Sequence, residues 1–356
     1  MNKKILHLPF FIRLLHWEFW PFGVVYAPLY LYWLWLCIKA RSFFFFNTSN
    51  PYIRNGGFLL ESKKEIYDLM PQQYYPNTLF FKALTPLQTI ITDIKSAAFT
   101  FPLIGKPDVG MKGLGVKKLN TIEEVIEYAQ SATADFLIQE FVPYENEVGI
   151  FYYRFPCQVK GFVSGIVSKK FLTVTGDGIS TIEALLQQDK RFILQLPALK
   201  RLHKEELQQI LAEKAQYVLV PYGNHSRGAK FIDAGHLIDE ELITTIDSIC
   251  KNVKGFYYGR LDIRYNSWEE LKQGISFSII EMNGAGSEPT HIYDPKHTIF
   301  YAWKEIVRHW NILYKISMHN HKSCSLPFMK FSAGIRMLRE NNRYVKSISE
   351  ETKIAA

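Results

Sequence analysis

The sequence contains little cysteine and lacks the motifs of several common protein classes. Its four cysteines, Cys37, Cys157, Cys250 and Cys324, lie far apart and form no CxxC pair. This usage is typical of a chain kept in a reducing compartment, so we expect a cytoplasmic protein. No GxxxxGK(S/T) phosphate loop and no GxGxxG dinucleotide motif is present. The two commonest nucleotide-binding signatures are therefore excluded.

The formal net charge of +8 is spread along the chain rather than concentrated in it. Because no basic run is interleaved with aromatic residues, we expect no nucleic-acid partner, although the charge would suit anionic lipid or a phosphate-bearing ligand. With 356 residues, of which 47% are hydrophobic, the chain is too apolar to be disordered and long enough for about two to three domains.

The N-terminal segment differs in composition from the rest. From Phe19 to Ile38 no residue is charged, and this length approaches that of a membrane-spanning helix. Trp and Tyr recur through its middle, however, and Pro21 and Pro28 interrupt it, which favours the membrane interface. We therefore predict that residues 1–45 associate with the cytoplasmic face of a membrane, either spanning it or lying on it. The alternative is an aromatic arm packed on a soluble body; no small-residue site for signal-peptide cleavage follows.

Beyond this segment the patterning is that of an α/β protein. Residues 121–132 begin with a threonine cap, carry acids in the first turn and repeat apolar residues at helical spacing. Further segments are predicted as helices at 180–188 and 240–253, and as strands at 136–142, 147–155, 259–265 and 277–283.

A lysine followed by glycines forms the first candidate site. In "FPLIGKPDVGMKGLGV" (101–116), a strand-like run delivers Lys106, and Gly110, Gly113 and Gly115 follow. Such a loop can bring backbone N–H groups close to phosphate oxygens while the lysine neutralises their charge. An ordinary hairpin is the alternative interpretation.

Acidic and amide side chains form the second candidate site. Glu140 ends one predicted strand and Glu147 begins the next, although two such acids also suit a solvated turn. Near the end of the chain, Asp262, Glu281 and Asn283 lie on two neighbouring predicted strands. Inward alternation would bring their hard oxygen atoms to one point, and Mg²⁺ accepts such ligands together with phosphate oxygens. Arg260 would share the face of Asp262.

Taken in order, these motifs resemble the ATP-grasp superfamily from about Pro76 to Trp310, and the D-alanine:D-alanine ligases in particular. A glycine-turn segment, "VTGDGISTIEALL", is similar to the ATP-grasp domain of cyanophycin synthetases, although its Gly-Asp-Gly turn and capped helix also suit a purely structural role. The resemblance implies an α/β (α+β) ATP-grasp fold with two α+β lobes that clasp ATP, here preceded by an N-terminal hydrophobic helical segment. The implied domains are 1–45, a hydrophobic membrane-associated segment; 46–98, an N-terminal region; 99–155, the nucleotide-binding lobe; 156–310, the metal and substrate lobe; and 311–356, a helical tail.

The resemblance also implies roles for single residues. Lys106 and the glycine loop would fold over ATP, Lys169 would reach its phosphates, and Arg260 would meet charge on the transferred phosphoryl group. The implied adenine contacts are Glu140, Phe141 and Val142; the implied ribose contact is Glu147; and the implied ligands of one or two Mg²⁺ ions, with Mn²⁺ as an alternative, are Asp262, Glu281 and Asn283. A further lysine, Lys82 or Lys95, would contact ATP.

The loops beyond these motifs depart from the ligases. After Asn283 the chain reads "GAGSEPTHIYDP", which adds Glu288 and His291 where the ligases have a short glycine-containing turn. The loop "PYGNHSRGAKFID" offers His225 and Arg227, either to grip a carboxylate or as a polar surface loop. A short HxHxxC cluster at 319–324 lacks a fourth zinc ligand, so chance is its better explanation.

The function implied by the resemblance is an ATP- and Mg-dependent ligase that joins a carboxylate to an amine through an acyl phosphate. An ATP-grasp phosphotransferase and a non-catalytic nucleotide-binding membrane protein are the alternatives. The substrates would be small-molecule or lipid-linked, and the aromatic N-terminal segment favours a lipid or a membrane-held amphiphile. The oligomeric state is left open.

Overall fold

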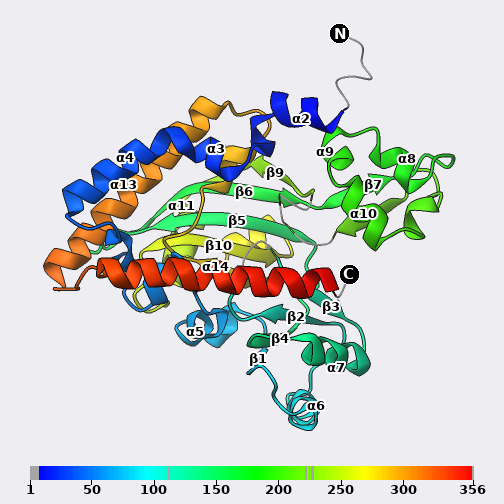
Figure 1. Cartoon of the computed structure of the whole chain (residues 1–356), viewed down its shortest axis with the longest axis horizontal. Coiled ribbons are helices and arrows are strands. Elements are labelled where there is room, and N and C mark those ends of the chain that lie inside the picture. The colour runs from blue at the N-terminus through cyan, green and yellow to red at the C-terminus, as the bar shows by residue number, and fades with distance from the viewer. Residues whose placement is uncertain (1–7, 111–112, 221–222, 224, 226–227, 355–356) are drawn as a thin grey trace.

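Three antiparallel sheets, with helices packed around them, form the protein (Figure 1). The computed structural model describes residues 8–110, 113–220, 223, 225 and 228–354. The mixed α/β class and the N-terminal hydrophobic helical segment predicted from the sequence are confirmed.

The first sheet has four strands in the order β1-β4-β2-β3. Its strands are β1 (Thr78–Phe81), β2 (Leu103–Pro107), β3 (Lys117–Leu119) and β4 (Phe136–Glu140). Helices α6 (Leu87–Ser96) and α7 (Ile122–Ser131) supply its apolar core. The prediction of a threonine-capped helix is confirmed, because the side chain of Thr121 accepts a hydrogen bond from the Glu124 amide.

The second sheet has five strands in the order β11-β10-β5-β6-β9. Its strands are β5 (Asn146–Tyr153), β6 (Phe162–Lys170), β9 (Lys230–Asp233), β10 (Tyr258–Tyr265) and β11 (Phe277–Asn283). Leu261 and Ile263 of β10 pack into the same core as α11 (Glu240–Lys251). Because side chains alternate along a strand, Arg260 and Asp262 face the opposite side of the sheet. The four-stranded sheet ends with β4 and the five-stranded sheet begins with β5. The change from one sheet to the other therefore lies within residues 99–155, which the resemblance implied to be a single nucleotide-binding lobe.

A smaller unit carries its own core. Strands β7 (Leu172–Thr175) and β8 (Gln216–Val220) form a two-stranded sheet, packed by α8 (Ile182–Leu186), α9 (Lys190–Ile193) and α10 (Leu196–Leu202). Short helices join the remaining elements: α5 (Lys63–Asp68), α12 (Trp268–Lys272), η5 (Gln72–Tyr74), η6 (Glu206–Gln208), η8 (Gly235–Leu237) and η9 (Thr290–Tyr293).

The N-terminal segment is part of the folded body. It contains α2 (Pro9–Leu15), η1 (Trp17–Phe19), α3 (Phe22–Tyr26), η2 (Ala27–Leu29) and α4 (Tyr30–Ala40). Helix α4 runs beside the long helix α13 (Ile299–Ser323), and α14 (Phe331–Ile354) crosses the molecule toward the four-stranded sheet (Figure 1). On its inner side the segment therefore packs on the rest of the protein, as in the alternative of an aromatic arm packed on a soluble body.

A buried asparagine ties the connection after α4 to the five-stranded sheet. This connection contains η3 (Phe45–Thr48) and η4 (Arg54–Gly57). The Asn50 amide donates to the carbonyls of Gly56 and Tyr258, each at 2.9 Å, and its Oδ1 accepts from the amides of Tyr257 and Tyr258 at 2.8 and 3.0 Å. All four hydrogen bonds are formed by one fully buried side chain.

We expect Asn50→Ala to lower the free energy of unfolding by about 3 kcal/mol, because it leaves several buried backbone groups without partners. Urea denaturation followed by circular dichroism measures the effect. The matched control is Asn252→Ala, which removes an exposed side chain whose Nδ2 donates to the Ser248 carbonyl within the same helix end. Equal losses in the two variants would contradict the assigned role of Asn50.

Candidate functional site

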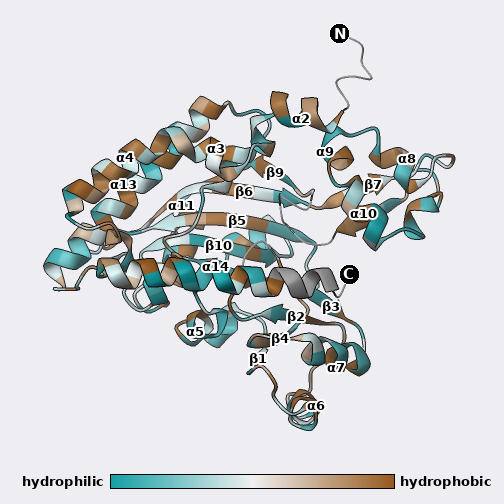
Figure 2. Ribbon diagram, in the orientation of Figure 1, coloured by the Kyte–Doolittle hydropathy of each residue, from teal (hydrophilic) through white to brown (hydrophobic). Residues whose placement is uncertain are grey.

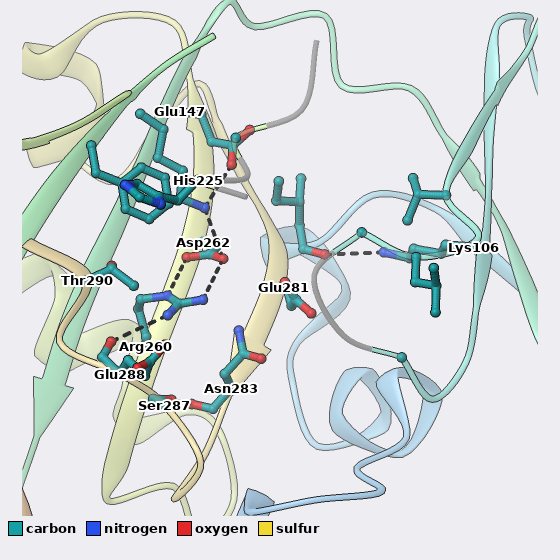
Figure 3. Close-up of a pocket in the computed structure, with 18 of the residues that line it drawn as sticks. Lys106, Glu147, His225, Arg260, Asp262, Glu281, Asn283, Ser287, Glu288 and Thr290 are labelled. Atoms are coloured by element: carbon teal, nitrogen blue, oxygen red, sulfur yellow. Dashed lines mark hydrogen bonds and ion pairs between the residues drawn. The ribbon is translucent and has the colours of Figure 1, made fainter. Parts of the chain in front are cut away.

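A cavity of about 660 Å³ lies between the four-stranded and five-stranded sheets. Its lining brings together the glycine loop, the end of β4, the exposed face of β10 and β11, and the turn between α2 and α3. Figure 3 shows Lys106 on one side of this space and Glu147, Asp262, Glu281 and Asn283 on the other. A cavity of this size is typical of small-molecule sites.

The register between β10 and β11 brings four of the candidate side chains together. Arg260 pairs with Asn283, and Asp262 pairs with Glu281. Directly opposite residues of an antiparallel pair point to the same face, as do residues two apart along one strand. All four side chains therefore share one face, and all four line the cavity.

Ion pairs connect these four side chains with charged residues of β5 and β6. Lys169 Nζ lies 2.8 Å from Glu147 and 3.0 Å from Asp262, and Arg260 donates to both oxygens of Asp262 at 2.8 and 3.1 Å. Arg264 approaches Glu147 at 3.6 Å. Burial alone would raise the pKa of Asp262, but the cations Arg260 and Lys169 hold it below its usual value. Each of the two carboxylates thus has cationic partners within the buried network.

The same face fits a divalent cation. Asp262 and Glu281 offer carboxylate oxygens and Asn283 offers an amide oxygen, which is the hard donor chemistry that Mg²⁺ accepts. The Asn283 amide nitrogen is buried and has no hydrogen-bond partner among the described residues, so this side chain is not committed to the fold. No group of three His, Cys, Asp or Glu residues suited to a metal occurs in the described part of the chain; here the third donor is an amide.

Lys106 is a buried cation at the opposite wall. Its Nζ donates to Gln139 Oε1 at 2.8 Å, to the Tyr67 hydroxyl at 2.9 Å and to the Ile280 carbonyl at 3.2 Å. Burial lowers its pKa to about 8, against the opposing effect of Glu281 and Asp108. None of these three partners is a carboxylate, so no described residue neutralises its charge through a direct ion pair.

The glycine loop lies on the same side of the cavity as Lys106. Gly110 and Gly113 line the cavity, whereas Gly115 packs behind it, where a Cβ would lie 2.8 Å from Pro107. Helix α14 supports the loop from outside, because the Tyr344 hydroxyl donates to the Val109 carbonyl at 2.6 Å. Met111 and Lys112 lie outside the described residues.

The end of β4 forms another wall. Glu140, Phe141 and Val142 all line the cavity. The Phe141 ring lies 4.9 Å from Lys118 Nζ, and Arg264 donates to the Val142 carbonyl at 3.3 Å. An apolar ring beside exposed backbone suits a flat ligand group with polar edges.

His225 lies in the cavity as a neutral group. Burial lowers its pKa to about 3, with a smaller contribution from Arg191. Its ring packs near Phe19, Phe231 and Tyr293, and its buried Nε2 has no partner among the described residues. Its neighbour in the sequence motif, Arg227, lies outside those residues.

Glu288 and His291, which follow Asn283 in the loop "GAGSEPTHIYDP", occupy different positions. Glu288 lines the cavity and accepts hydrogen bonds from Tyr26 at 2.6 Å and Tyr293 at 3.1 Å. His291 does not line the cavity, contrary to our expectation. It is buried beside β6, where a Cβ on Gly165 would overlap it, and its Nε2 lies 3.4 Å from Glu305. Thr290 and Tyr293 of η9 do line the cavity, so the chain stays beside it and His291 projects from the other side of this short helix into the core.

Several cavity residues escaped the sequence interpretation. Lys63 lines the cavity, but Lys82 and Lys95, which the sequence offered, are not part of its described lining. Tyr67 and Gln139 hold Lys106, yet no motif spacing distinguishes them from ordinary core and strand residues. The segment from α2 to the start of α3 adds a further group of lining residues: Arg13, Glu18, Phe19, Trp20 and Phe22. The aromatic residues of this segment were the one feature of the sequence that could have pointed to its place in the cavity wall.

The sequence matches no family model and no curated protein. Among solved structures, the chain is similar to a bifunctional glutathione synthetase from Pasteurella multocida (16% identity, TM-score 0.37), the VanG D-Ala:D-Ser ligase from Enterococcus faecalis (14%, 0.40) and a D-alanine–D-alanine ligase from Bacillus anthracis (14%, 0.43). The matches cover 68%, 72% and 74% of this chain, and 34%, 61% and 68% of the respective structures. The chain therefore spans about a third of the synthetase and less than two thirds of the D-Ala:D-Ser ligase.

We expect Lys169→Met to lower the free energy of unfolding by about 3 kcal/mol at neutral pH, because Glu147 and Asp262 each lose a buried cation. Lys170→Met removes the next side chain along β6, which is exposed, and should change stability by less than about 0.5 kcal/mol. Urea denaturation of both variants at the same pH gives the comparison. Loss of stability in both, or in neither, would contradict the network.

Proposed function

We propose that this protein is an ATP- and Mg-dependent ligase of the ATP-grasp type, which joins a carboxylate to an amine through an acyl phosphate. The observation that carries the proposal is the single face formed by Arg260, Asp262, Glu281 and Asn283, set across one cavity from the buried cation Lys106. A cation at one wall and hard oxygen donors at the other suit a polyphosphate that carries a metal ion.

The two walls would divide the work of binding the nucleotide. Lys106, Lys63 and the backbone of the glycine loop lie where they can contact phosphate oxygens, and Lys169 faces the same space from β6. Asp262, Glu281 and Asn283 would hold Mg²⁺, which supplies charge neutralisation for the phosphates when it is bound. The nucleoside would lie against Phe141 and the β4 backbone, and Glu147 would accept hydrogen bonds from the sugar hydroxyls.

The acceptor would occupy the end of the cavity beside Glu288. Arg260 reaches this end, because its Nη1 donates to the Glu288 carbonyl at 3.4 Å while its other nitrogens hold Asp262. A guanidinium fixed in this way stabilises negative charge that develops on an acyl phosphate. The aromatic side chains of Phe19 and Tyr293 line the same end and exclude the water that would hydrolyse such an intermediate.

Trapping with hydroxylamine tests the reaction class. The protein is incubated with Mg·ATP, hydroxylamine and a pool of carboxylic acids, and we expect a hydroxamate together with ADP. Glu281→Gln should lower the rate by at least about 100-fold through loss of a metal ligand, whereas Glu269→Gln, an exposed acid on the same hairpin, should leave it unchanged.

The products also separate the alternatives. A stable phosphoester in place of the hydroxamate would replace ligation by phosphotransfer. ATP binding with neither product would leave a nucleotide-binding protein without catalysis. Equal rates in the Glu281 and Glu269 variants would show that the Glu281 carboxylate is not a metal ligand.

Nucleotide binding should be coupled to proton uptake above pH 7. The pKa of Lys106 is about 8 in the free protein, so part of the population is neutral at pH 8. Bound phosphates would raise this pKa again, because they favour the charged ammonium. Calorimetry at pH 8 in buffers of different ionisation enthalpy should show proton uptake on ATP binding, and affinity should fall as the pH rises through 8. Both effects should vanish in Lys106→Met; their persistence would exclude Lys106 as their source.

A further inference from the structure

The outer side of the N-terminal helices is apolar and exposed. In the helical run from Phe22 to Ala40, Val25, Leu29 and Leu36 are buried against the body, yet Leu31 is 79% exposed and Ile38 is 61% exposed. A helix that is apolar on all sides requires a partner on each side. The body covers only the inner side.

The exposed apolar side chains extend over neighbouring elements. We call this surface the outer face, and its main members are Phe10, Leu14, Leu31, Leu34, Trp35 and Ile38. Figure 2 shows α2, α3 and α4 as largely hydrophobic ribbons along one edge of the molecule. Exposed Phe300 of α13 adjoins this edge, because its neighbour Trp303 donates to the Val25 carbonyl at 2.8 Å. Exposed large apolar side chains gathered along one edge in this way mark an interaction site.

The charge around the outer face favours a membrane over a soluble partner. The first 60 residues contain six basic residues and one acid, Glu18. That acid is buried and paired with Arg191 at 2.8 Å, so it adds no negative charge to the surface. Arg13, Lys39 and Arg41 are exposed beside the apolar side chains. Apolar residues flanked by cations suit the interface of an anionic bilayer.

Contacts on the inner side indicate that the helical run lies along the membrane rather than crossing it. Among the described residues, one helical run, Phe22–Ala40, is long and apolar enough to span, which by itself is weak evidence. Its inner side, however, holds specific polar contacts: Tyr26 donates to Glu288, and the Val25 carbonyl accepts from Trp303. Insertion across a bilayer would break these contacts and expose the core that includes Leu36. The helix therefore remains on the body and presents its outer side.

The same segment forms a wall of the catalytic cavity. Phe19, Trp20 and Phe22 line the cavity, and Phe22 is also half exposed at the molecular surface. Phe22 stacks on Tyr26 with ring centroids 4.0 Å apart, and the Tyr26 hydroxyl bonds to Glu288. These contacts connect the molecular surface at Phe22, on the same N-terminal segment as the outer face, with the acceptor end of the cavity.

We propose that the outer face docks on the surface of an anionic bilayer, with α3 and α4 parallel to it, and that the acceptor is a lipid-borne amphiphile that enters the cavity past Phe22. The docking stands on the exposed apolar and basic side chains alone. The identity of the acceptor rests on the proposed ligase function.

Vesicle flotation tests the docking. The full chain is mixed with vesicles of phosphatidylglycerol and phosphatidylcholine, or of phosphatidylcholine alone, without ATP. We expect binding to the anionic vesicles, and we expect Leu31→Glu/Ile38→Glu to lower the partition coefficient by at least about tenfold. The matched control is Val159→Glu/Ile179→Glu, which makes the same charge change at side chains 87% and 82% exposed elsewhere. This control should bind as the unmodified protein does.

Failure of the unmodified protein to bind anionic vesicles, or equal binding by both double variants, would overturn the docking. Light scattering tests whether a second copy of the protein covers the outer face instead. If the protein forms a dimer that Leu31→Glu/Ile38→Glu dissociates, the outer face is an interface between copies and the proposal is wrong. Thermal midpoints show that both variants are folded, which we expect because all four side chains are exposed.

Photo-crosslinking tests the route into the cavity. With vesicles that contain a diazirine-bearing phosphatidylglycerol, we expect crosslinks to peptides of the outer face and also to residues 19–22. Crosslinks restricted to α2 and α4 would overturn lipid access while leaving the docking intact. None of these measurements depends on ATP, so failure of the hydroxamate assay and failure of membrane docking are separate results.

Discussion

The antiparallel register between β10 and β11 is the constraint on which the site depends. It places Asp262 opposite Glu281 and Arg260 opposite Asn283, with Leu261 and Ile263 buried on the other face. A slip of one residue would move the charged set into the apolar core and the core residues into the cavity. The hydrophobic packing beneath the sheet and the polar chemistry above it therefore specify the same register.

The charged face is stable only as a compensated network. Glu147 and Asp262 are both buried, and each meets at least one cation, with Lys169 shared between them. An isolated buried carboxylate would take up a proton. The acids and bases that alternate across β5, β6 and β10 therefore compensate one another within the buried face.

The N-terminal helices and the connection that follows them form part of this architecture. The amides of Ala285 and Gly286 bond to the carbonyls of Gly56 and Gly57, so the loop after Asn283 is clamped by the connection that follows α4. A Cβ on Gly284 would lie 2.6 Å from the Gly56 carbonyl oxygen, which explains the glycine there. The membrane-facing helices that we propose are thus fixed to the same frame as the candidate metal ligands.

The sequence by itself determined the α/β class, the strands that carry Asp262 and Glu281, and the capped helix at Thr121, because alternation, helical spacing and capping are local properties. Only the tertiary structure decided which polar residues meet. Lys63, Tyr67 and Gln139 join the site through contacts between distant segments, and His291 lies outside it because η9 turns Thr290 and Tyr293 toward the cavity and His291 toward the core. Likewise, the sequence showed that residues 19–38 are apolar throughout, but only packing against α13 decided which side is buried and which faces outward, since that choice depends on elements nearly three hundred residues away.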